Sequence, residues 1–102
     1  MTSNKVGMTE TPAQFLQKRD AWIRMLVGDL EMSHATTRVG VHLVMRMTAK
    51  NRTAWPATKT IAKETGVSVR TVIRAIDQLE AEGYLHCTRK RNVGNRYSFR
   101  FP

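Results

Sequence analysis

Two short helical patterns, at residues 58–65 and 69–82, are separated by only three residues, Gly66, Val67 and Ser68. A connection this short makes two helices cross at close range. Glycine readily adopts the positive φ with which many helices end. Ser68 can cap the next helix by accepting hydrogen bonds from its first backbone N–H groups. The spacing therefore predicts a pair of short crossed helices joined by a tight turn.

Each helix of this pair has an apolar side and a polar side. Helical periodicity puts Val72, Ile76 and Leu79 on one face, and Ile61 and Val67 extend the apolar side. The opposite, polar face consists of Arg70, Thr71, Arg74 and Gln78. We expect the apolar side to pack on the preceding helix and the polar side to project outward.

The remaining segments predict a mainly α fold with a small β-sheet. Pro12 can begin a helix that Thr11 caps, and Ser33 can cap a second helix. Trp55 is expected to be extended, in a short strand or turn, because Pro56 follows it. Strands are expected at residues 84–88 and 96–101, joined by a hairpin loop. The expected organisation is a disordered arm (1–11) and a single domain (12–102), which contains an N-terminal helix (12–29), a second helix (33–48), the crossed pair (58–83) and the hairpin (84–101).

The charge of the chain is concentrated in its C-terminal half. The 102 residues carry a formal net charge of +9, and residues 50–102 hold eleven basic and four acidic side chains. From Arg89 to Arg100 there are five bases and no acid. A basic cluster of this kind attracts polyanions. We therefore expect a polyanionic partner that binds to the C-terminal half.

Other classes of protein are not indicated. No apolar run approaches the roughly 20 residues that span a bilayer, and the N-terminus lacks the apolar segment of a secretory signal. Cys87 is the only cysteine, and the three histidines do not have the spacing of metal ligands. The sequence contains no catalytic constellation. We expect a cytoplasmic protein that is not an enzyme and has no cofactor, metal or small-molecule ligand.

Residues 61–85 resemble the helix-turn-helix of winged-helix regulators, including GntR-type repressors and helix-turn-helix proteins of phages and plasmids. The resemblance extends from about Ser33 to Phe101. It implies a winged helix-turn-helix fold with a three-helix core and a C-terminal β-hairpin wing, here with an extra N-terminal helix. It also implies that the helix from Ser68 to Glu82 enters the major groove of double-stranded DNA. The expected function is that of a sequence-specific, nucleoid-associated transcriptional regulator.

The resemblance also implies which residues contact DNA. Arg70 is the expected base reader, because a guanidinium pairs with guanine O6 and N7 and discriminates by about 1–3 kcal/mol. The implied groove contacts are Ser68, Arg70, Thr71 and Arg74. Lys59 and Thr60 are expected near the phosphate backbone. The implied wing contacts, on the backbone or minor groove, are Arg89, Lys90, Arg91, Asn92, Asn95 and Arg96, and we assign them mainly to affinity.

Several of these patterns have a second interpretation. Arg70 and Arg74 could form a solvated face paired with Asp77, and the wing bases could serve only to prevent pairing of strands between molecules. The aromatic residues that alternate along the last strand could stack on single-stranded nucleic acid, although such residues more often belong to a core.

The sequence also leaves two questions open: what the first helix packs against, and what biological role the protein has. The apolar face of the first helix, formed by Phe15, Trp22, Ile23 and Leu26, is either part of the core or the seam of a homodimer. The role could instead be that of a DNA-binding domain of a replication initiator, or of a recombination accessory factor of phage or plasmid type. A winged-helix module for protein interaction is a further alternative, because a fold does not determine a function.

Overall fold

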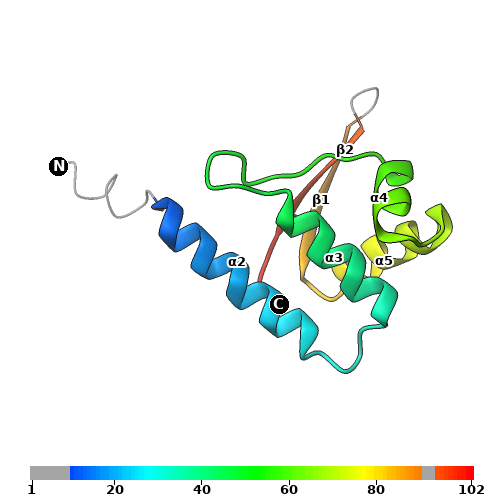
Figure 1. The fold of residues 1–102 in the computed structure, drawn as a ribbon, viewed down its shortest axis with the longest axis horizontal. Coiled ribbons are helices and arrows are strands. Elements are labelled where there is room, and N and C mark those ends of the chain that lie inside the picture. Colours follow the sequence, from blue (N-terminus) through cyan, green and yellow to red (C-terminus); the bar gives the residue numbers. More distant parts are fainter. Residues whose placement is uncertain (1–9, 91–93) are drawn as a thin grey trace.

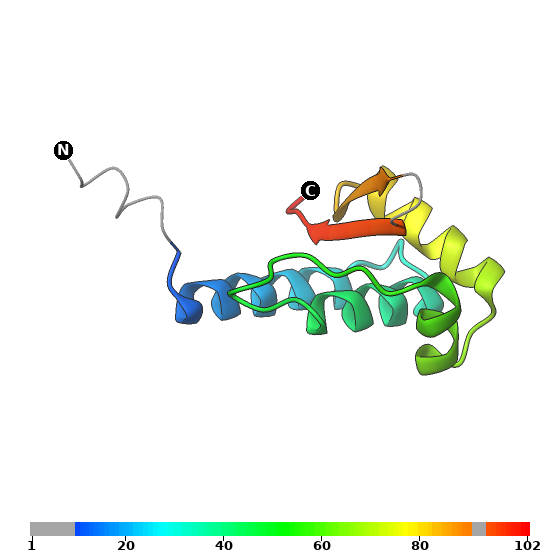
Figure 2. The same ribbon diagram turned by 90° about the horizontal axis from the view of Figure 1, so that it is seen from above.

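The structure, a computed structural model, describes residues 10–90 and 94–102. These residues form four helices, α2 (Pro12–Val27), α3 (His34–Met45), α4 (Thr58–Thr65) and α5 (Val69–Ala81), and two strands, β1 (Leu85–Lys90) and β2 (Gly94–Phe99). Helices α2 and α3 lie side by side, the β1–β2 hairpin lies over them, and α4 and α5 are at one end (Figures 1 and 2). This is the predicted winged helix-turn-helix, mainly helical, with an additional N-terminal helix.

Helices α2 and α3 begin where local capping signals are found. The backbone N–H of Gln14 donates to the Thr11 hydroxyl at 3.1 Å, and the Gln14 side chain accepts from the N–H of Thr11 at 2.9 Å. Ser33 caps α3 by accepting from the N–H of Thr36 at 3.1 Å. Thr11 and Glu10, which the sequence interpretation placed in an arm, thus contact the domain, and the Glu10 carboxylate is ion-paired with Lys18 and Arg52.

The hairpin is longer at its turn end than the sequence indicated. Antiparallel pairing runs from Leu85 opposite Phe99 to Lys90 opposite Gly94. The residues expected to form its loop are therefore largely paired, because backbone groups make the ladder whatever the polarity of the side chains. Ala54 adds a one-residue bridge, donating to the carbonyl of Tyr97 at 2.9 Å and accepting from its N–H at 2.8 Å. The extended segment predicted before Pro56 is thus a short third edge of the sheet.

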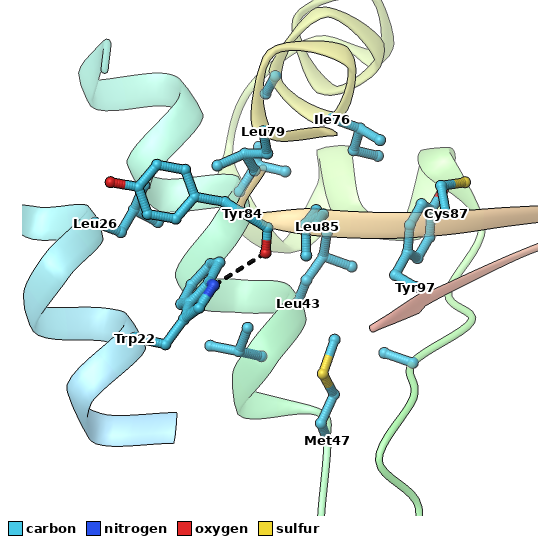
Figure 3. Close-up of a cluster of buried hydrophobic side chains, with 14 of the residues drawn as sticks. Trp22, Leu26, Leu43, Met47, Ile76, Leu79, Tyr84, Leu85, Cys87 and Tyr97 are labelled. Atoms are coloured by element: carbon cyan, nitrogen blue, oxygen red, sulfur yellow. Dashed lines mark hydrogen bonds between the residues drawn. The ribbon is translucent and has the colours of Figure 1, made fainter. Parts of the chain in front are cut away.

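The core unites all four helices with the hairpin. Figure 3 shows the central side chains, with Trp22 of α2 beneath Tyr84 and Leu85. The Trp22 indole Nε1 donates to the backbone carbonyls of Tyr84 at 3.0 Å and Arg100 at 2.9 Å. The Tyr84 and Trp22 rings meet edge to face with centroids 5.8 Å apart. Helix α2 is therefore an integral part of the domain.

This packing decides between the two interpretations of the first helix. Phe15, Trp22 and Leu26 are buried, with at most 1% of each side chain exposed, and Ile23 packs partly against the same core. The alternative of a homodimer seam does not fit the burial of Phe15, Trp22 and Leu26 within the chain. Amphipathicity showed that the face needs a partner, and the partner is the rest of the same chain.

Candidate nucleic-acid interface

The turn between α4 and α5 has the geometry that its three residues predicted. Gly66 has φ 77° and its N–H donates to the carbonyl of Ala62 at 2.9 Å, so it ends α4 in the left-handed conformation. Ser68 caps α5 by accepting from the N–H of Thr71 at 3.1 Å. The Arg38 guanidinium of α3 donates to the carbonyl of Thr65 at 3.0 Å. These three hydrogen bonds fix the end of α4 and the start of α5.

Polar contacts also fix α4 against α3. Glu64 of α4 accepts from His42 Nε2 at 2.6 Å and from the Arg46 guanidinium at 2.9 Å. The hydrogen bond with His42 is the main reason that the pKa of the Glu64 carboxyl lies below its usual value. These contacts fix the position of α4 relative to α3.

Helix α5 presents a basic surface on the side opposite the core. Its buried residues are Val72, Ala75, Ile76 and Leu79. Arg70 and Arg74 are exposed, one helical turn apart, and neither has an ion-pair or hydrogen-bond partner in the part of the chain that the structure describes. The alternative, in which Arg70 and Arg74 pair with Asp77, is not found among the described residues. Asp77 Oδ1 lies 3.7 Å from Arg89 Nη2.

Two residues assigned to this polar face have other contacts. Gln78 is half-buried, accepts from the Thr36 hydroxyl at 2.8 Å and donates to the carbonyl of Glu31 at 3.4 Å, so it joins α5 to the start of α3. The sequence interpretation placed Gln78 on the outward polar face, whereas its side chain contacts α3. The Thr71 hydroxyl accepts from the Ser68 hydroxyl at 2.9 Å and is part of the cap.

Arg89 connects the hairpin to α5. Its guanidinium donates to the two Glu80 oxygens at 3.0 and 3.4 Å and lies 3.7 Å from Asp77. The hydrogen bond from Arg89 lowers the pKa of Glu80, and the same bond raises the pKa of Arg89. Arg89, which the sequence interpretation assigned to DNA contact, is thus paired with two acids of α5.

The remaining residues assigned to DNA are distributed over two elements. Lys59 is exposed and Thr60 half-buried, both in the first turn of α4. Arg96 is exposed on β2, and Asn95 donates weakly to the Tyr97 hydroxyl at 3.4 Å. The side chains of Lys90, Arg91 and Asn92 lie outside the described residues. Figure 1 shows α4, α5 and the hairpin together in one half of the molecule.

The structure adds two residues that the sequence interpretation did not assign. Ile73 has 47% of its side chain exposed beside Arg70 and Arg74, and Trp55 has 55% exposed before α4. Periodicity could have found Ile73, because it does not fall on the apolar side of α5. The environment of Trp55 depends on contacts with β2, which no local signal indicates.

Residues 10–90 and 94–102 contain neither a metal-binding cluster nor a membrane-spanning helix. No group of three or more His, Cys, Asp or Glu side chains could hold a metal ion. No helix is long and apolar enough to span a bilayer. Tyr97 is buried, and burial raises its pKa, so this aromatic residue of the last strand belongs to the core.

The sequence of this unit matches a known family. Residues 30–85, more than half of the chain, match a family described as a helix-turn-helix domain. No curated protein matches the sequence. The matched segment runs from just before α3 to the start of β1 and contains the complete α4–turn–α5 unit. Such domains indicate DNA binding and are typically non-enzymatic.

Proposed function

This chain belongs to the helix-turn-helix domain family, and from that premise we propose that it reads a specific sequence in duplex DNA as a small transcriptional regulator. Helix α5 would enter the major groove, and the hairpin would lie on the backbone or in the minor groove. The observation that carries the proposal is the pair of exposed guanidinium groups of Arg70 and Arg74, which have no partner among the described residues. They lie on a helix whose start is capped and whose opposite side is buried.

The roles of the basic residues differ in this proposal. Arg70 lies in the first turn of α5, the part of a recognition helix that reaches base edges, and would read guanine. Lys59 lies in the first turn of α4 and would contact a phosphate, which carries no sequence information. Arg89 supports both indirectly by neutralising Asp77 and Glu80. We further propose that the relatives of this chain are GntR-type or phage and plasmid regulators, which residues 61–85 resemble in sequence.

Selection of bound duplexes from a random pool, followed by titration at several salt concentrations, tests the proposal. We expect one preferred sequence, and affinity that falls with salt with a logarithmic slope of about 0.9 per phosphate contacted. Arg70→Ala should reduce the preference for the selected duplex over random DNA by roughly tenfold or more. Lys59→Ala should weaken both complexes equally and leave the preference unchanged.

The outcomes separate the parts of the proposal. No binding, or binding independent of salt, would contradict DNA binding and favour a protein-interaction module. Preferred sites clustered at a replication origin or attachment site, and absent from promoters, would contradict the regulatory role alone. A palindromic site bound by two copies would support a homodimer. That homodimer would use residues other than Phe15, Trp22 and Leu26, which the core buries.

A further inference from the structure

We propose that Trp55 and Arg96 together form a binding site for the sugar-phosphate backbone of duplex DNA, separate from the recognition helix. In this site the Arg96 guanidinium holds a phosphate and the Trp55 ring packs on the adjoining deoxyribose. The inference rests on the proposed function, because it requires that the protein binds DNA. It adds a contact from the segment between α3 and α4, to which the sequence interpretation assigned none.

The two tryptophans of the chain have opposite environments. Trp22 is fully buried, whereas 55% of the Trp55 side chain is exposed. The backbone at Trp55 is nevertheless fixed, because Ala54 makes two hydrogen bonds with Tyr97 and Pro56 restricts its predecessor to an extended conformation. A large aromatic ring is therefore held at the surface by a rigid segment, and burial in the core does not account for it.

Arg96 is stacked on this ring. Its Cζ atom lies 5.0 Å from the centroid of the Trp55 ring, a cation–π contact. No acid is paired with Arg96 within the described part of the chain. Stacking leaves the donors around the edge of the guanidinium plane available for bidentate bonding to a phosphate. Because the stacked side chain is already oriented, less conformational entropy is lost when it binds.

The surroundings of the pair suit a backbone of alternating phosphates and sugars. A hollow of about 310 Å³ beside the ring is lined by Arg46, Asn51, Thr53, Ala54, Trp55 and Pro56. From Arg46 to Lys63 the sequence contains five bases and no acid. The positive charge would attract the phosphates, and the ring offers an apolar surface for a sugar.

The position of the pair agrees with the proposed DNA-binding side. Trp55 precedes α4, which begins at Thr58, and Arg96 lies close to the Gly94 end of β2. Figure 1 shows the entry to α4, the hairpin and α5 in the same half of the molecule. A duplex that contacts both α5 and the hairpin would therefore lie near the entry to α4, which Trp55 precedes.

Tryptophan fluorescence with acrylamide, a neutral quencher, tests the contact directly. In the free protein Trp55 should be quenched and the buried Trp22 should be protected. Addition of a duplex of about 20 base pairs, or two helical turns, should protect Trp55 from acrylamide. The Trp55→Phe variant, which retains only Trp22, should give emission that neither acrylamide nor DNA changes appreciably. Quenching of Trp55 that is the same with and without bound duplex would overturn the proposal.

Affinity measurements with labelled duplex supply the second readout. Trp55→Ala should weaken binding to selected and random duplexes alike by roughly tenfold, as truncation of an interface aromatic does. Arg96→Lys keeps the charge but loses the flat stacking and the bidentate geometry, so it should lose nearly as much affinity as Arg96→Ala. Wild-type affinity in Arg96→Lys would show that charge alone acts there and would contradict the site.

These results remain distinguishable from failure of the proposed function. A wild-type protein that does not bind labelled duplex contradicts DNA binding itself, and the site with it. A protein that binds duplex while Trp55 stays accessible contradicts only the Trp55–Arg96 site. Unfolding in urea should show that both Arg96 variants are folded. If Trp55→Ala does not fold, the quenching of the wild-type protein still decides.

Discussion

Ile73, exposed on α5 beside Arg70 and Arg74, could contact a base in the major groove. The 5-methyl group of thymine is the main apolar feature of the major groove, and apolar side chains contact it. Ile73 has 47% of its side chain exposed and would bury this surface against a thymine next to the base read by Arg70. The contact would specify a thymine without any hydrogen bond.

Replacing that thymine by uracil removes only the methyl group, so it tests this contact specifically. In the selected duplex, the replacement should weaken binding of the wild-type protein by roughly fourfold, the equivalent of one buried methyl group. In Ile73→Ala the same base change should have almost no effect, since the partner of the methyl is gone. Titration of both duplexes against both proteins measures this coupling.

Val27→Ala is the matched control, because Val27 is also an exposed β-branched residue but lies on α2. It should show the same uracil effect as the wild-type protein. An undiminished uracil effect in Ile73→Ala would contradict the thymine contact. That result would leave the role of Arg70 untouched.

Helices α2, α3 and α5 pack together at Gly40 of α3. A Cβ atom added there would lie 2.7 Å from Leu26 Cδ2, 3.2 Å from a Trp22 ring carbon and 3.3 Å from Leu79 Cδ1. All three neighbours are fully buried, so none can move aside freely. Glycine is required because α2, α3 and α5 approach one another this closely.

Gly40→Ala should therefore destabilise the protein, although helix propensity alone favours alanine by about 1 kcal/mol. We expect the free energy of unfolding, measured in urea, to fall by about 1–3 kcal/mol because the core is overpacked. Gly28→Ala is the control, since Gly28 has φ −83° and an added Cβ atom would lie no closer than 3.4 Å to its nearest contact, the Arg24 carbonyl oxygen. It should change the free energy by less than about 0.5 kcal/mol. A stabilised Gly40→Ala protein would show that the helices can separate without loss.

At the scale of the whole molecule, Tyr84 joins the α2–α3 connection to the hairpin. Its hydroxyl donates to the Asp29 carboxylate at 2.7 Å, and its backbone carbonyl accepts from Trp22. Burial, and then the bond to Asp29, raises the pKa of Tyr84 from 10.0 to about 12. The folded state therefore holds this proton more tightly than the unfolded state does.

This difference predicts how stability depends on alkaline pH. The contribution of Tyr84 is complete below pH 10, the unperturbed value, and is lost as the pH rises toward about 12. Tyr84→Phe keeps the ring but cannot ionise. The free energy of unfolding should therefore decline less steeply in the variant than in the wild-type protein between pH 10 and 12. Equal declines would contradict the raised pKa, and the absorbance of tyrosinate provides an independent titration of the same group.

The fold was largely predictable because its signals are local. Caps at Thr11, Ser33 and Ser68 and the positive φ of Gly66 depend on residues within one helical turn, so they are visible in the sequence. The helical periodicity of the apolar residues likewise showed which side of each helix requires burial. The DNA contacts of Arg70 and Arg74 stay predictions, but their exposure on the side away from the core follows from that same periodicity.

The sequence by itself thus determined the order of the elements, the tight turn between α4 and α5, and the basic side of α5. Only the tertiary structure decided which partners meet. It buried Trp22 under Tyr84 and not in a homodimer seam, paired Arg89 with Glu80, and stacked Arg96 on Trp55. These partners are far apart in the chain or lie on different elements. Their contacts depend on how the helices and hairpin pack, which periodicity and capping do not encode.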